Sequence, residues 1–183
     1  APTGPCSAGY YCTGGASLPT QHETPAGTYT TEGSAAPIPC PPGTYQTQTI
    51  QSSCLDCLAG YYCQNQSTIN IELCPAGSYC PTGTITPKGC PPGTYSNVPG
   101  LSNSSQCISC PPGKYCQGEG LLADSGSCYA GYVCTGGASV PNPTICPAGR
   151  YCEAGTYNPT PCPVGTYSSA TGLIFWSITP DWS

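Results

Sequence analysis

A six-residue frame, Cys-x-x-Gly-x-Tyr, recurs ten times along the 183 residues and limits what this chain can fold into. Successive copies start 16 to 20 residues apart, with Thr24 replacing the first cysteine once and Val133 replacing the tyrosine once. A longer repeat of 122 residues lays CTGGASLP at Cys12 over CTGGASVP at Cys134, so duplication built the chain. We therefore expect an array of small units with contacts confined to neighbouring units. The copies begin at Cys6, Thr24, Cys40, Cys57, Cys74, Cys90, Cys110, Cys128, Cys146 and Cys162.

The cysteines define two kinds of repeat. In the closed kind a second cysteine directly follows the tyrosine position, and in the open kind it comes later or not at all. The Thr24 repeat has lost both cysteines that its counterpart 122 residues later retains, and this paired loss indicates that the two bond to each other. We infer the bridges Cys6–Cys12, Cys40–Cys54, Cys57–Cys63, Cys74–Cys80, Cys90–Cys107, Cys110–Cys116, Cys128–Cys134 and Cys146–Cys152, with Cys162 unpaired. An interlaced scheme, joining Cys57 to Cys74 and Cys63 to Cys80, is the alternative, because counting alone does not fix connectivity.

The composition leaves little material for an apolar core. Only 22 of the 183 residues are Ile, Leu, Val or Phe, whereas 17 are Cys, 24 Gly and 23 Pro. Pro and Gly in the frame favour tight turns, and the tyrosine ring is expected to cover the disulfide of its own unit. The predicted fold is a small disulfide-rich repeat protein: an elongated rod of short β-hairpins and turns, with little helix and a minimal hydrophobic core.

Cysteine usage and charge indicate the compartment and exclude several partners. So many thiols in a chain with one histidine point to an oxidising, extracellular location, whether secreted or on a surface. Three cations and a net charge of −5 argue against nucleic-acid binding, and no apolar run reaches the length of a membrane span. The chain opens at Ala1 without a charged and then apolar run, so we expect any leader to have been removed or to lie outside this sequence.

The stretch CPPGTYSNVPGLSNSSQCISCPPGKYC, residues 90–116, resembles the ephrin-receptor-like cysteine-rich repeat family. It is also similar to the first half-module of tumour-necrosis-factor-receptor cysteine-rich domains. In those modules the long bridge joins the cysteines that correspond to Cys90 and Cys107. The resemblance extends to about Gly172 and implies rod-like extracellular spacers, stalks and matrix parts, with no catalytic motif to carry over.

Candidate sites for metal, redox or acid-base chemistry have simpler explanations. The pairs Cys54/Cys57 and Cys107/Cys110 have CxxC spacing, but they lie too far apart for a zinc ribbon and mark where one repeat meets the next. His22 is the single histidine, and the carboxylates are scattered. We expect no enzyme activity and no cofactor.

Two sequons indicate modification, and the C-terminal tail indicates assembly. Asn65 and Asn103 begin acceptor sequons, so we expect covalent glycans there. After three repeat blocks, 1–56, 57–109 and 110–172, an atypical apolar tail covers 173–183. One interpretation makes it an assembly segment that docks on a neighbouring subunit; the other makes it a truncated or wrongly assigned coding end. The apolar residues concerned are Leu173, Ile174, Phe175, Trp176 and Ile178.

The leading functional hypothesis is a non-enzymatic structural protein. It would be a glycosylated cysteine-rich rod that self-associates to form or space an extracellular filament, surface hair or coat. The alternative is a ligand-binding cysteine-rich ectodomain of a receptor-like or adhesion protein.

Overall fold

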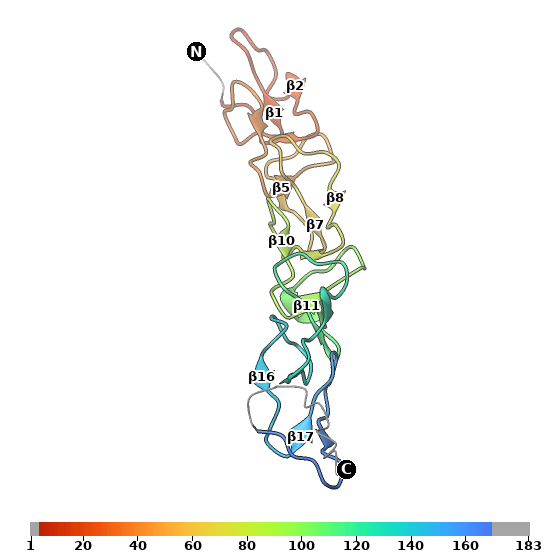
Figure 1. Ribbon diagram of the computed structural model, residues 1–183. Coiled ribbons are helices and arrows are strands. Elements are labelled where there is room, and N and C mark those ends of the chain that lie inside the picture. The colour runs from red at the N-terminus through yellow and green to blue at the C-terminus, as the bar shows by residue number, and fades with distance from the viewer. Residues whose placement is uncertain (1–3, 170–183) are drawn as a thin grey trace, which may run out of the picture. The chain divides into compact units, whose positions relative to one another are not determined.

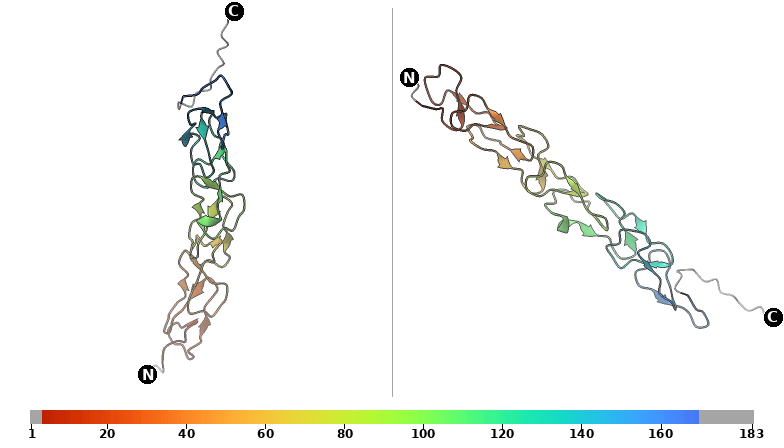
Figure 2. Two further views of the ribbon diagram at one scale, coloured as in Figure 1. Left: turned by 90° about the horizontal axis from the view of Figure 1, so that it is seen from below. Right: turned by 90° about the vertical axis from the view of Figure 1, so that its left-hand side faces the viewer.

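The computed structural model describes residues 4–169 and consists of short antiparallel hairpins joined by turns (Figure 1). Contacts group the chain into two compact units, one built from residues 1–88 and 99–103 and the other from 89–98 and 104–183. Views from two further directions show the same succession of small hairpins in each unit (Figure 2). The predicted disulfide-rich repeat fold is confirmed.

Every strand is two residues long. In each hairpin the first strand is formed by the residue at the frame tyrosine position and the residue before it, and the second strand by the two residues that precede the next repeat. The first unit holds β1 (Tyr10–Tyr11), β2 (His22–Glu23), β3 (Thr28–Tyr29), β4 (Ile38–Pro39), β5 (Thr44–Tyr45), β6 (Leu55–Asp56), β7 (Tyr61–Tyr62), β8 (Glu72–Leu73) and β9 (Ser78–Tyr79). The unit boundary falls within β10 (Lys88–Gly89). The second unit holds β11 (Thr94–Tyr95), η1 (Ser104–Gln106), β12 (Ile108–Ser109), β13 (Lys114–Tyr115), β14 (Gly126–Ser127), β15 (Tyr132–Val133), β16 (Thr144–Ile145), β17 (Arg150–Tyr151) and β18 (Thr160–Pro161). Consecutive strands pair in each hairpin, as where Tyr62 lies opposite Glu72 and Tyr61 opposite Leu73.

Successive repeats are joined by backbone hydrogen bonds. We number the repeats 1 to 10 in chain order. The fourth residue of each repeat is called the frame glycine, and the seventh is called the closing residue. Between repeats 3 and 4, the Gly43 N–H donates to the closing residue Cys63, and the Gly43 carbonyl accepts from the Cys57 N–H, both at 2.8 Å. Two more bonds run between the repeat-3 turn and the following loop of repeat 4. The Gln46 N–H donates to the Thr68 carbonyl at 3.1 Å, and the Ser67 N–H donates to the Cys40 carbonyl at 2.9 Å.

The same four backbone bonds join each pair of consecutive repeats from repeat 1 to repeat 5 in the first unit, and from repeat 6 to repeat 9 in the second. The loop residue that donates, corresponding to Ser67, always has positive φ. It is glycine at five of these seven junctions, and Ile50 (φ 59°) and Ser67 (φ 57°) occupy the other two. Because only backbone atoms take part, the junction forms whatever the exposed side chains are.

Contacts also reach the second neighbour, so the expectation that they stop at adjacent repeats is wrong. A Cβ on Gly43 in repeat 3 would lie 2.8 Å from the carbonyl oxygen of Gly83 in repeat 5. A Cβ on Gly113 in repeat 7 would lie 2.3 Å from the carbonyl oxygen of Gly155 in repeat 9. The frame glycine is therefore needed both for its positive φ and for this close approach of two backbones.

The eight disulfides join the pairs inferred from the repeats, and Cys162 is free and partly exposed. Within the described residues, the buried apolar side chains other than cysteine are Leu101, Val133 and Ala138. Two bridges are covered from the preceding repeat, although each tyrosine was expected to cover the bridge of its own unit: Tyr115 packs on Cys128 and Cys134, and Val133 packs on Cys146 and Cys152. At these two places the core lies between repeats, which couples the stability of both bridges to the repeat that precedes them.

Repeat 2 closes its turn without a disulfide. Thr24 and Thr30 occupy the two cysteine positions, both are fully buried, and their hydroxyls hydrogen-bond to each other. The Thr24 hydroxyl also donates to the Gly9 carbonyl at 2.7 Å. Buried hydroxyls need such partners, so this pair keeps the geometry of a bridged turn by non-covalent means.

Candidate interaction site

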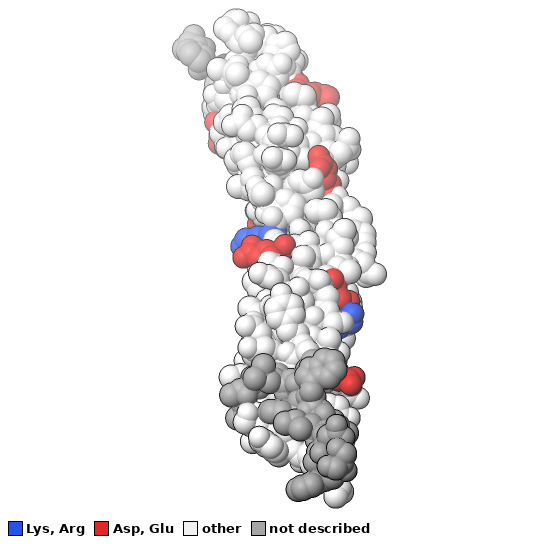
Figure 3. All heavy atoms as spheres, in the orientation of Figure 1, with Lys and Arg blue, Asp and Glu red and all other residues white. Residues whose placement is uncertain are grey.

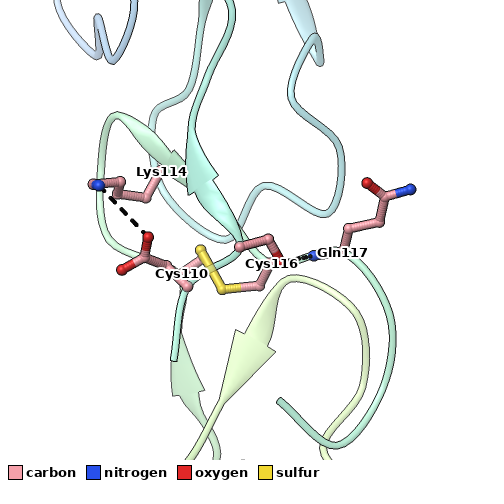
Figure 4. A network of polar contacts seen from close by, with 6 residues as sticks. Cys110, Lys114, Cys116 and Gln117 are labelled. Atoms are coloured by element: carbon pink, nitrogen blue, oxygen red, sulfur yellow. Dashed lines mark hydrogen bonds and ion pairs between the residues drawn. A yellow bond between two sulfur atoms is a disulfide. The ribbon is translucent and has the colours of Figure 1, made fainter. Parts of the chain in front are cut away.

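Charged groups are sparse on the molecular surface. On the face drawn in Figure 3, the charged side chains form a few small patches within a largely uncharged surface, and the basic patches lie beside acidic ones. Near the closed turn Cys110–Cys116, Lys114 forms an ion pair with Asp124 at 3.5 Å, and Lys114 and Gln117 project away from the disulfide (Figure 4). Both partners of this pair are partly exposed, so the pair contributes little to stability.

A polar hollow lies at the hairpin β7–β8 of the first unit. Its volume is about 210 Å³, and it is lined by residues 62–68 together with Asn70 and Glu72. The hairpin register places the side chains of Tyr62 and Glu72 on directly paired strand positions, which brings the phenol and the carboxylate together. The Tyr62 hydroxyl donates a hydrogen bond to Glu72 Oε2.

The carboxylate controls the titration of the phenol. The hydrogen bond to Glu72 raises the pKa of Tyr62 above its ordinary value, and desolvation and the negative charge of Glu72 act in the same direction. The neutral phenol is therefore the form that this site favours, and it presents an apolar ring with a fixed hydroxyl.

The loop around the hollow is rich in amides. Gln64, Asn65, Gln66 and Asn70 are all exposed, and within residues 4–169 their side-chain amides form no hydrogen bonds to protein groups. Amides and a carboxylate supply several donors and acceptors at one place. Such a surface suits a polyhydroxylated ligand better than an apolar or a charged one.

Residues 27–74 match the family model described as tyrosine-protein kinase ephrin type A/B receptor-like. This segment is similar to the ephrin-receptor-like family. The match confirms the resemblance inferred from the cysteine frame, and the ephrin-receptor-like segment contains the hollow. No curated protein sequence matches the chain. Together with eight disulfides, the ephrin-receptor-like segment indicates an extracellular domain.

The two CxxC pairs are parts of separate bridges. Cys54 bonds to Cys40 and Cys57 to Cys63, and in the second unit Cys107 and Cys110 are likewise bonded to different partners. Among the described residues, no three His, Cys, Asp or Glu side chains are placed to hold a metal ion. In the same part of the chain, no helix has the length and apolar character needed to cross a membrane.

The remaining sequence-predicted residues lie apart from the hollow. His22 is exposed and stacks on Tyr11 with ring centroids 5.0 Å apart. Asn103, the second sequon, is exposed directly before η1, and its side-chain amide donates to the Ser102 hydroxyl at 3.4 Å. The proposed assembly segment, from Leu173 to Ile178, lies outside the described residues.

The hollow itself was not foreseen from the sequence. The signal that could have found it is the amide-rich run Gln64-Asn65-Gln66 flanked by Tyr62 and Glu72. Sequence reasoning read Asn65 alone, as a sequon, because the pairing of Tyr62 with Glu72 depends on the length of the hairpin loop.

Proposed function

We propose that this chain is a non-enzymatic structural protein of the extracellular space, a glycosylated cysteine-rich rod that forms or spaces a filament, surface hair or coat. The four-bond backbone junction is the observation that carries the proposal. Because it repeats with the same atoms from one turn to the next, adding repeats adds length without requiring new side-chain complementarity. Disulfides supply the stability that the small core lacks.

The spacer role is tested by changing the number of repeats. Deleting residues 57–73 removes one whole closed repeat and its bridge and brings repeat 3 next to repeat 5 in the same frame. We expect the remaining bridges to form and the maximum dimension measured by small-angle X-ray scattering to fall by one repeat. A matched control deletes residues 64–73, which leaves the Cys57–Cys63 turn but breaks the frame; it should misfold or scramble its disulfides. A whole-repeat deletion that leaves the maximum dimension unchanged would contradict the spacer role.

Self-association rests on the apolar sequence of the tail. Electron microscopy of the negatively stained full chain should show fibres, and deletion of residues 173–183 should abolish them. Unchanged fibres in the deletion variant would remove the tail from the proposal, and short isolated particles in both would remove the filament.

A second candidate function is a ligand-binding ectodomain of a receptor-like or adhesion protein. The ephrin-receptor-like match and the polar hollow at β7–β8 favour it. Binding of a soluble protein or glycan that is lost in Glu72→Gln and retained in Glu119→Gln would support this function over the structural one.

A further inference from the structure

The hollow at β7–β8 surrounds a sequon. Tyr62 stands three residues before Asn65, and Ser67, which completes the sequon, stands two residues after it. All three residues line the hollow. A group attached to the Asn65 side chain would therefore start from a residue that lines the same hollow as Tyr62.

The backbone around Asn65 is held in place by the preceding repeat. The Ser67 N–H donates to the Cys40 carbonyl at 2.9 Å, and the Gln46 N–H donates to the Thr68 carbonyl at 3.1 Å. The Thr68 hydroxyl donates to the Asn65 carbonyl at 2.7 Å, which closes the loop on itself. These bonds hold the Asn65 loop against the turn of repeat 3, so a ligand that contacts both Asn65 and the β7–β8 hairpin meets a preformed surface.

We propose that the first sugar residues of an N-glycan on Asn65 lie in this hollow, with the apolar face of a pyranose ring over Tyr62. The amides of Gln64 and Asn70 and the Glu72 carboxylate then bind the sugar hydroxyls and the acetamido group. This proposal rests on the glycosylation that forms part of the proposed function. The chemistry is that of a saccharide site: one aromatic ring and a few convergent polar groups around a concave surface.

The size of the hollow agrees with this occupant. A volume of about 210 Å³ is below the roughly 300–1,000 Å³ of pockets for drug-sized ligands, and it suits a group of one or two rings. A tethered sugar also needs less affinity than a free one, because attachment supplies a high effective concentration.

The second sequon provides a control within the same chain. Gly100 stands three residues before Asn103, so no aromatic ring occupies the equivalent position. Asn103 is exposed directly before η1 and does not line the hollow. A glycan on Asn103 should therefore remain free in solvent.

The experiment uses the full chain secreted from cells that attach N-glycans, with carbon-13 in the sugars. Mass spectrometry of glycopeptides first establishes occupancy at each sequon. Ring-current shifts of the sugar protons in nuclear magnetic resonance spectra then report contact with an aromatic ring. We expect upfield shifts for the innermost sugars on Asn65 and none for those on Asn103.

Two variants assign the shifts. Tyr62→Leu should abolish them, whereas Tyr61→Leu, which changes the adjacent ring that does not line the hollow, should leave them in place. The Cys57–Cys63 bridge, mapped in each variant, shows that the turn has formed. If Asn65 is glycosylated but its sugars match those on Asn103, the docking proposal is overturned and glycosylation stands. If Asn65 carries no glycan, both are overturned.

Discussion

Replacing Gly43 by alanine should open the chain locally where repeats 3, 4 and 5 meet. Gly43 has φ +85°, and a Cβ there would lie 2.8 Å from the Gly83 carbonyl oxygen. The oxygen has little freedom to withdraw, because the Gly83 N–H is bonded to the Cys57 carbonyl at 2.8 Å. The left-handed conformation costs an L-residue about 1–2 kcal/mol, and losing one or two junction hydrogen bonds costs about 1 kcal/mol each. The total is roughly 2–4 kcal/mol.

Two other glycines separate the conformational cost from the collision. Gly83 has φ +75° with nothing within 4 Å of its added Cβ, so Gly83→Ala should cost only about 1–2 kcal/mol. Gly14 has no positive φ and no close neighbour, so Gly14→Ala should be neutral or slightly stabilising.

Amide hydrogen exchange is the appropriate assay, because arrays of repeats do not unfold in a single all-or-none step. A loss of 2–4 kcal/mol corresponds to exchange of the Gly43 and Cys57 amides that is roughly 30- to 700-fold faster, with distant repeats unaffected. Equal acceleration in Gly43→Ala and Gly83→Ala would refute the reasoning, since the backbone contact between repeats 3 and 5 would then contribute nothing.

Three further predictions follow from single positions. The double substitution Thr24→Cys and Thr30→Cys should close a ninth bridge and stabilise repeat 2 by about 2 kcal/mol; thiol titration checks the bridge, and Thr24→Cys alone, which leaves one more free thiol, is the control. Ile50→Gly should stabilise the first unit by about 1 kcal/mol in denaturant, because Ile50 has φ 59°; a loss of stability would contradict this. Glu72→Gln should lower the pKa of Tyr62, measured as phenolate absorbance against a Tyr62→Phe reference. In the unaltered chain the stabilisation from this hydrogen bond is present below the ordinary pKa of tyrosine and is lost as pH rises through the raised value; an unchanged Tyr62 titration in Glu72→Gln would exclude the carboxylate as the cause.

The bridges could be inferred from the sequence because duplication left a natural comparison. Thr24 and Thr30 replace two cysteines together, and the structure shows the reason: the two positions touch in the folded turn. The turn glycines could also be predicted from the sequence, because tight turns need positive φ whatever lies around them.

The contacts between repeats could not be inferred, because they depend on the pitch of the stack and not on any one residue. The packing of Tyr115 on the next repeat's bridge is one example. The left-handed loop position is a partial exception. In most repeats a glycine occupies this loop position, three or four residues after the closing residue. The sequence therefore shows a second recurring glycine besides the frame glycine. Ile50 and Ser67 hid it in repeats 3 and 4.

The backbone junction has a consequence for how such a chain evolves. When whole repeats are exchanged or duplicated, the new neighbours can form the same N–H to carbonyl hydrogen bonds as the old ones. The recombined chain can therefore form its new junctions without further substitutions. Selection can then act on the number of repeats while the loops diverge freely. The 122-residue duplication is one such event preserved in this chain.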